Sequence, residues 1–130
     1  MSRGNGAGER PRTVLVVDDD ALIRETVAWA LEDAGCAVLQ AEDGQRALQA
    51  IGARPADLIL LDMRMPVMDG WAFARAYRAR PGPHAPIVVV SAAQDAAERA
   101  AQVGAAGYLA KPFDLGDLLS LVERHAAPVA

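Results

Sequence analysis

The sequence predicts a doubly wound α/β domain, in which helices cover both faces of a five-stranded parallel sheet. Short aliphatic runs without polar alternation recur along the chain, as is typical of strands buried on both faces. Stretches with apolar residues at helical spacing separate these runs. Most of the runs end in a charged or hydroxyl side chain. Regular alternation of strands and helices favours a parallel sheet with right-handed crossovers.

The first predicted unit begins with a strand over residues 14–17, which are all Val or Leu. Asp20 is suited to cap the following helix, because Asp is favoured at that position. Gly35 ends the helix. The apolar residues that recur at helical spacing between these limits are Ile23, Val27, Ala30, Leu31 and Ala34.

Two further strand–helix units are predicted in the middle of the chain. The second strand is less aliphatic than the third, which is fully apolar and ends at Asp62. Each strand is followed by a stretch with an apolar helix face. The predicted elements are residues 37–41, 43–53, 58–61 and 70–80.

The last two units follow a turn that is rich in Pro and Gly. The fourth strand ends at Ser91 and the fifth at Lys111, and Gly104 closes the Ala-rich helix between them. The core face of the last helix is predicted to contain Leu115, Leu118, Leu119 and Val122. The predicted elements are residues 87–90, 94–103, 107–110 and 113–125.

Length and composition indicate one folded domain. The chain has 130 residues, and its 52% hydrophobic content argues against disorder. We expect residues 1–12 to be a flexible tail, 13–126 the domain and 127–130 a short tail. A net charge of −4 argues against a nucleic-acid surface, and no apolar run approaches the ~20 residues of a membrane span. The single cysteine and the lack of a visible signal peptide favour the cytoplasm.

Reactive side chains gather at one predicted edge of the sheet. The first strand is followed by Asp18, Asp19 and Asp20, and three later strands end at Asp62, Ser91 and Lys111. The carboxyl ends of parallel strands meet at the edge where α/β domains bind ligands. Carboxylate oxygens suit Mg²⁺, and Lys suits a phosphate oxygen. The predicted chemistry is therefore phosphoryl transfer.

Five motifs, in order, resemble the receiver domains of response regulators in two-component signalling, the CheY-like family. They are Val-Val-Asp18-Asp19-Asp20, Leu-Leu-Asp62-Met-Arg-Met-Pro66, Met-Asp69-Gly70, Val-Ser91-Ala92 and Gly107-Tyr108-Leu-Ala-Lys111-Pro112-Phe113. The likeness runs from about residue 13 to residue 124. It implies a flavodoxin-like sheet with the strand order 2-1-3-4-5.

The resemblance implies that Asp62 accepts a phosphoryl group from a histidine kinase or phosphotransfer protein. Asp18, Asp19, Asp62 and the main-chain carbonyl of Arg64 would hold Mg²⁺, with Mn²⁺ as the alternative ion. The domain would catalyse only its own phosphorylation and dephosphorylation, so it is expected to be a signalling domain rather than an enzyme. Its output protein is not identified by the sequence.

Further roles follow from the same resemblance. Lys111 would contact the phosphoryl oxygens, Ser91 would donate a hydrogen bond to one of them, and Ala92 is small enough to admit the group. Ser91 and Tyr108 would form the conformational switch. The start of the first helix would meet the kinase, and the candidate interface residues are Leu22, Ile23, Thr26 and Trp29.

The peptide bond between Lys111 and Pro112 is predicted to be cis. Lys111 must point inward toward Asp62 while the chain turns at once into the last helix, and a trans bond would direct the ammonium away. The X-Pro bond makes this conformation accessible, because its cis form costs only about 0.5–1 kcal/mol.

Two alternatives stay open at this stage. Residues 18–22 also fit loosely the Asp-x-Asp loop of haloacid-dehalogenase-like phosphatases, in which Asp18 would be the nucleophile. The chain could also be the receiver fragment of a larger multidomain regulator. The stretch Ala105-Ala106-Gly107 lacks the acidic pair of receivers that dimerise in transcription factors, so a direct contact with nucleic acid is not expected.

Overall fold

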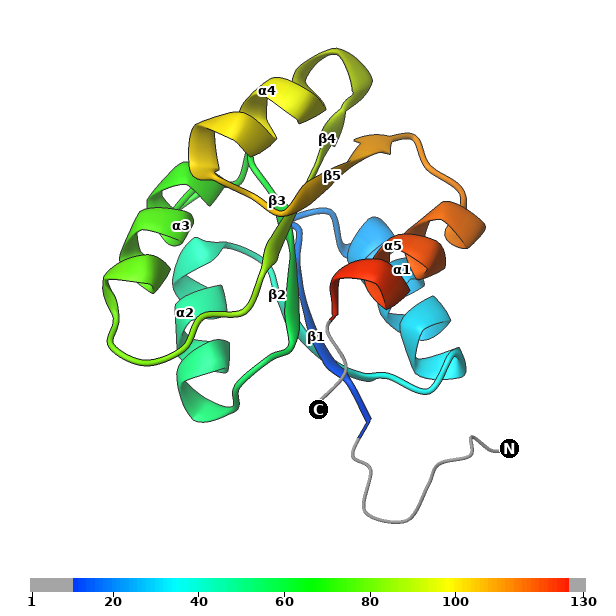
Figure 1. The fold of residues 1–130 in the computed structure, drawn as a ribbon, viewed down its shortest axis with the longest axis horizontal. Helices are drawn as coiled ribbons and strands as arrows, with labels where there is room; N and C mark the ends of the chain where they lie inside the picture. The colour runs from blue at the N-terminus through cyan, green and yellow to red at the C-terminus, as the bar shows by residue number, and fades with distance from the viewer. Residues whose placement is uncertain (1–10, 127–130) are drawn as a thin grey trace.

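The computed structural model describes residues 11–126, and there it contains five strands and five helices (Figure 1). The strands are parallel and lie in the order β2-β1-β3-β4-β5, so the predicted fold is confirmed. In chain order the elements are β1 (Thr13–Val17), α1 (Ala21–Asp33), β2 (Ala37–Ala41), α2 (Gly44–Ala53), β3 (Leu58–Asp62), α3 (Gly70–Ala79), β4 (Ile87–Ala92), α4 (Ala93–Val103), β5 (Gly107–Lys111) and α5 (Leu115–His125).

The sheet is the middle layer of three. α1 and α5 cover one face, and α2, α3 and α4 cover the other (Figure 1). Alternate residues of the central strands therefore enter two separate cores. Leu15 and Ile59 pack with Phe73 on the α3 side, whereas Val14 and Leu58 belong to the core on the α1 side. Burial on both faces explains why these strands are apolar without alternation.

Aspartate begins four of the five helices. The N-caps Asp20, Asp43, Asp69 and Asp114 each accept hydrogen bonds from main-chain N–H groups in the first helical turn. Such caps satisfy N–H groups that have no partner inside the helix. The exception is α4, which follows Ser91 and Ala92 directly and has no side-chain cap. All five helices begin at the carboxyl edge of the sheet, since each one follows a strand.

Several predicted details are wrong. Strand β4 continues to Ala92, two residues past the predicted end. Helix α5 begins at Leu115, two residues later than predicted, because Asp114 is its cap. Leu115 is 37% exposed and Ala34 is exposed, so neither belongs to the core face that was predicted for it.

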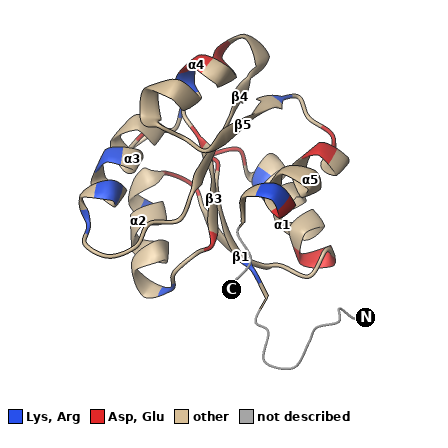
Figure 2. Ribbon diagram, viewed as in Figure 1, with Lys and Arg blue, Asp and Glu red and all other residues tan. Residues whose placement is uncertain are grey.

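The predicted tails mostly lie outside the described part of the chain. Residues 1–10 and 127–130 are not described, so the limits 13–126 stay a prediction. Within the described residues no helix is long and apolar enough to span a membrane. Lys and Arg are distributed over several elements of the described domain (Figure 2).

Candidate functional site

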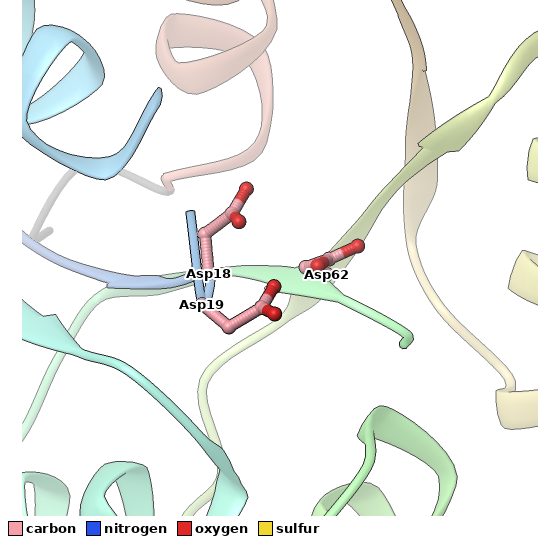
Figure 3. Close-up of side chains that lie close together, drawn as sticks. All are labelled: Asp18, Asp19 and Asp62. Atoms are coloured by element: carbon pink, nitrogen blue, oxygen red, sulfur yellow. The ribbon is translucent and has the colours of Figure 1, made fainter. Parts of the chain in front are cut away.

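Three carboxylates converge at the carboxyl edge of the sheet. Asp18 and Asp19 follow β1, and Asp62 is the last residue of β3. One oxygen atom from each of the three side chains lies within 4.8 Å of the others (Figure 3). Asp18 and Asp62 are buried, whereas Asp19 is exposed. Oxygen ligands at this spacing, open to solvent on one side, fit a hard divalent cation that keeps several waters.

The register of the sheet explains this convergence. β1 and β3 are parallel neighbours in which Val17 pairs with Leu61, so the residues that follow them meet at one edge. The main chain around Asp18 is held in place. Its side-chain Oδ1 accepts a hydrogen bond from the N–H of Asp20 at 2.9 Å, and its carbonyl accepts one from Arg24 Nη1 at 2.8 Å.

Lys111 provides the cation of the site. Its Nζ lies 3.1 Å from Asp18 Oδ2 and 3.7 Å from Asp62 Oδ1, although β5 is not a neighbour of β1 or β3 in the sheet. The peptide bond between Lys111 and Pro112 is cis, as expected from the sequence. At 3.7 Å from Asp62 Oδ1, the ammonium group is close enough to contact an anion held at Asp62.

The surroundings of Asp62 disfavour its ionised form. Burial raises its pKa to about 6, and the charges of Asp18 and Asp19 act in the same direction. Lys111 and a hydrogen bond from the main-chain N–H of Arg64 lower the pKa and offset part of that effect. A bound divalent cation would favour the ionised carboxylate.

The loop after Asp62 packs too tightly to admit side chains at two glycines. A Cβ at Gly70 would lie 2.6 Å from Met63 Sδ and 3.0 Å from the Asp62 carbonyl oxygen. A Cβ at Gly44 would lie 2.7 Å from the Met68 side chain. Neither glycine was predicted as a site residue, although the Asp-Gly pairs at both helix starts were a visible signal in the sequence.

Ser91 is buried, and its hydroxyl oxygen accepts a hydrogen bond from Arg99 Nη1. Arg99 lies on α4 and was not among the predicted site residues. Its position four residues after Asp95 in an Ala-rich helix signalled an ion pair, which the structure contains at 3.2 Å. Nothing local in the sequence indicated that its side chain turns back to Ser91. Ala92, the other predicted phosphoryl-binding residue on this strand, is half-buried.

Tyr108 and the predicted interface lie at the surface. Tyr108 is 48% exposed in β5. An apolar groove runs between α1 and the start of α5, next to Lys111, and its lining includes Leu22, Ile23 and Thr26. Trp29 is 64% exposed but does not line that groove, so three of the four predicted interface residues are grouped there.

Comparison with known proteins gives consistent matches. The family described as "Response regulator receiver domain" matches residues 14–123. The DNA-binding transcriptional regulator NtrC of Escherichia coli is 42% identical over 113 residues, which are 85% of this chain and 24% of NtrC. The transcriptional regulatory protein PdtaR of Mycobacterium tuberculosis is 39% identical over 116 residues, or 87% of this chain and 56% of PdtaR. The chain thus spans between a quarter and about half of these relatives.

A solved structure agrees in fold over nearly the whole domain. The chemotaxis response regulator CheY4 of Vibrio cholerae is 36% identical, with a TM-score of 0.80 over 88% of this chain and 98% of that one. These matches do not support the phosphatase alternative with Asp18 as the nucleophile. In addition, both carboxylate oxygens of Asp18 accept hydrogen bonds, one from the Asp20 N–H and one from Lys111.

Proposed function

Because the chain belongs to the family of response regulator receiver domains, the phosphoacceptor domains of two-component signalling, we propose that Asp62 accepts the phosphoryl group. The observation that carries the assignment is that Asp62 belongs to the acidic cluster and lies 3.7 Å from Lys111. Asp18 also meets both conditions, but its two carboxylate oxygens are already engaged by the Asp20 N–H and by Lys111. A carboxylate between a cation site and an ammonium group can attack phosphorus while its neighbours neutralise the phosphoryl oxygens.

The proposed donor is a phosphohistidine of a kinase or a phosphotransfer protein. An oxygen of Asp62 attacks the phosphorus and forms a P–O bond, the P–N bond breaks, and its electron pair leaves with the imidazole. Lys111 then exchanges its carboxylate contacts for a phosphoryl oxygen. Ser91 donates its O–H to another phosphoryl oxygen, and the small Ala92 leaves room for the group.

The acidic cluster is proposed to hold Mg²⁺, with Mn²⁺ as the alternative ion. The ligands would be Asp18, Asp19, Asp62 and the main-chain carbonyl of Arg64. When bound, the ion would supply positive charge to the phosphoryl oxygens. The support is the set of three carboxylates with oxygens within 4.8 Å, of which one is open to solvent.

The kinase or phosphotransfer protein is proposed to dock at the groove that Leu22, Ile23 and Thr26 line. This groove borders Lys111, so a partner seated there would present its phosphohistidine to Asp62. Trp29 lies beyond the groove and would be a peripheral contact. The phosphorylated domain would then act on a protein partner through the Ser91 and Tyr108 switch, as a cytoplasmic signalling domain and not as an enzyme with an external product.

Mass spectrometry after incubation with acetyl phosphate and Mg²⁺ tests the assignment. We expect one added phosphoryl group in the unchanged protein and none in Asp62→Asn. Asp18→Asn is the matched control, since it removes a carboxylate of the same cluster, and it should still be phosphorylated at a reduced rate. A phosphoryl group on Asp18, or on Asp62→Asn at the normal rate, would overturn the proposal.

A further inference from the structure

Arg99 connects three elements through one half-buried guanidinium group. Its Nη1 donates to Ser91 Oγ on β4, and its Nη2 lies 3.2 Å from Asp95 Oδ2 on α4. The guanidinium carbon lies 5.6 Å from the centre of the Trp71 ring on α3. The Arg99 side chain is only 14% exposed. A surface ion pair with Asp95 would not require this burial, so the contacts to Ser91 and Trp71 determine where the guanidinium lies.

The hydrogen bond from Arg99 does not involve the hydroxyl proton of Ser91. A guanidinium can only donate, so it occupies an acceptor site of Ser91 Oγ. The O–H of Ser91 therefore remains available to an acceptor such as a phosphoryl oxygen. A hydroxyl that accepts from a cation also becomes a stronger donor, because hydrogen bonds in a chain polarise one another.

Hydrogen bonds hold both the side chain of Trp71 and the main chain next to it. Its Nε1 donates to Gln102 Oε1 on α4 at 2.9 Å, and it follows Gly70, whose N–H donates to the carbonyl of Met63. Met63 directly follows Asp62. Trp71 thus has a ring in contact with Arg99 and a main chain that directly follows the residue bonded to the loop after Asp62.

We propose that Arg99 is a positioning residue that holds Ser91 for the phosphoryl group and transmits its displacement to the Trp71 ring. When Ser91 moves to donate to a phosphoryl oxygen on Asp62, the Arg99 guanidinium either moves with the hydroxyl or its hydrogen bond to Ser91 breaks. Both outcomes change the contact between Arg99 and the indole. The inference rests on the proposed phosphorylation of Asp62.

Tryptophan fluorescence can test this link. The chain has two tryptophans, so Trp29→Phe leaves Trp71 as the sole emitter. Trp29 is a suitable residue to replace because it is 64% exposed. We expect acetyl phosphate with Mg²⁺ to shift the Trp71 emission in this background, beyond the change that Mg²⁺ alone causes. Mass spectrometry on the same samples gives the phosphorylated fraction, to which each shift is normalised.

Arg99→Met in the same background should lose the phosphorylation-dependent shift per phosphorylated molecule, and Arg99→Lys should restore part of it. Arg124→Met is the charge-matched control on α5, and it should behave like the background. Ser91→Ala provides a second route if Arg99→Met does not fold, and it should also lose the shift.

The outcomes separate the two proposals. Absence of phosphorylation in the background protein would overturn the proposed function. Normal phosphorylation without a Trp71 shift in that protein, or a shift that survives in both Arg99→Met and Ser91→Ala, would overturn the role of Arg99. A loss in Arg99→Met that Arg124→Met reproduces would also overturn it.

Discussion

Asp57 and Asp62 lie at opposite ends of β3, and their carboxylates have different surroundings. Asp57 Oδ2 accepts a hydrogen bond from the N–H of Thr13 at 2.8 Å, and its own N–H donates to the Thr13 carbonyl at 2.7 Å. Asp62 instead lies with Asp18 and Asp19, where burial raises its pKa to about 6. At the start of β3, the Asp57 carboxylate links β3 to β1 by a hydrogen bond. The other end keeps carboxylates close together at a cost in stability, which a cation or a phosphoryl group can relieve.

The largest expected effect is stabilisation by Mg²⁺. If the proposed site is correct, the ion would bind the folded state and reduce the repulsion among three carboxylates. At 100-fold excess over Kd the gain should then be about 2.7 kcal/mol. Thermal unfolding with and without millimolar Mg²⁺ measures the effect. Asp19→Asn should lose most of the gain, and Asp57→Asn should keep it. An equal gain in Asp19→Asn would place the ion elsewhere.

The raised pKa of Asp62 should make the free energy of unfolding depend on pH. Its folded pKa of about 6 lies above the ordinary value of 3.8, so folding favours the protonated form. The stabilising contribution is present below about pH 4 and is lost as pH rises through about 6.

In Mg²⁺-free buffer at pH 7, Asp62→Asn should therefore be more stable than the unchanged protein by about 1–2 kcal/mol. Urea unfolding of both proteins between pH 4 and pH 8 checks the difference, which should shrink toward pH 4. A constant difference across this range would show that the ionisation of Asp62 is not its cause.

Asp57→Ala should lower the free energy of unfolding, whereas Asp62→Asn should raise it. Asp57→Ala removes the acceptor for the Thr13 N–H between β1 and β3 and should cost about 1 kcal/mol. Asp57→Asn keeps a side-chain oxygen and should cost less. Urea unfolding at pH 7 measures both variants. If Asp57→Ala were as stabilising as Asp62→Asn, the carboxylates at the two ends of the strand would not differ in their effect on stability.

The smallest expected effect concerns the loop at the Asp62 end. Val67 has a φ of 70°, and the N–H of Met68 donates to the Pro66 carbonyl across it at 2.7 Å. A β-branched residue is disfavoured in this left-handed region, where Asn is better tolerated. Val67→Asn should therefore stabilise the fold by about 0.5 kcal/mol. Val67→Ile, which keeps the branch, should show no gain in the same unfolding measurement.

The sequence predicted the architecture well because burial on both faces leaves a strong pattern in the central strands. Val14 to Val17 and Leu58 to Leu61 are apolar for that reason, and parallel pairing then brings Asp18 and Asp62 to one edge. Strand β2 is at the sheet edge and half-buried, so its pattern was weaker.

Details that depend on tertiary contacts were not predictable in the same way. Asp114 as a cap moved the start of α5, and the pairing of Arg99 with Ser91 joins residues that meet only after α4 packs on the sheet. The tight packing of Gly44 against Met68 likewise joins segments that are far apart in the chain.

The aspartate caps also affect how fast small anions reach the site. Because each helix begins at the carboxyl edge, Asp20, Asp43, Asp69 and Asp114 add their charge near that of Asp18, Asp19 and Asp62. An anionic donor such as acetyl phosphate therefore diffuses toward a negative surface potential. At low ionic strength this field slows the encounter, and added salt screens it beyond a Debye length, which is about 10 Å at 0.1 M. A protein donor that carries its own basic groups to this edge would be accelerated by the same field.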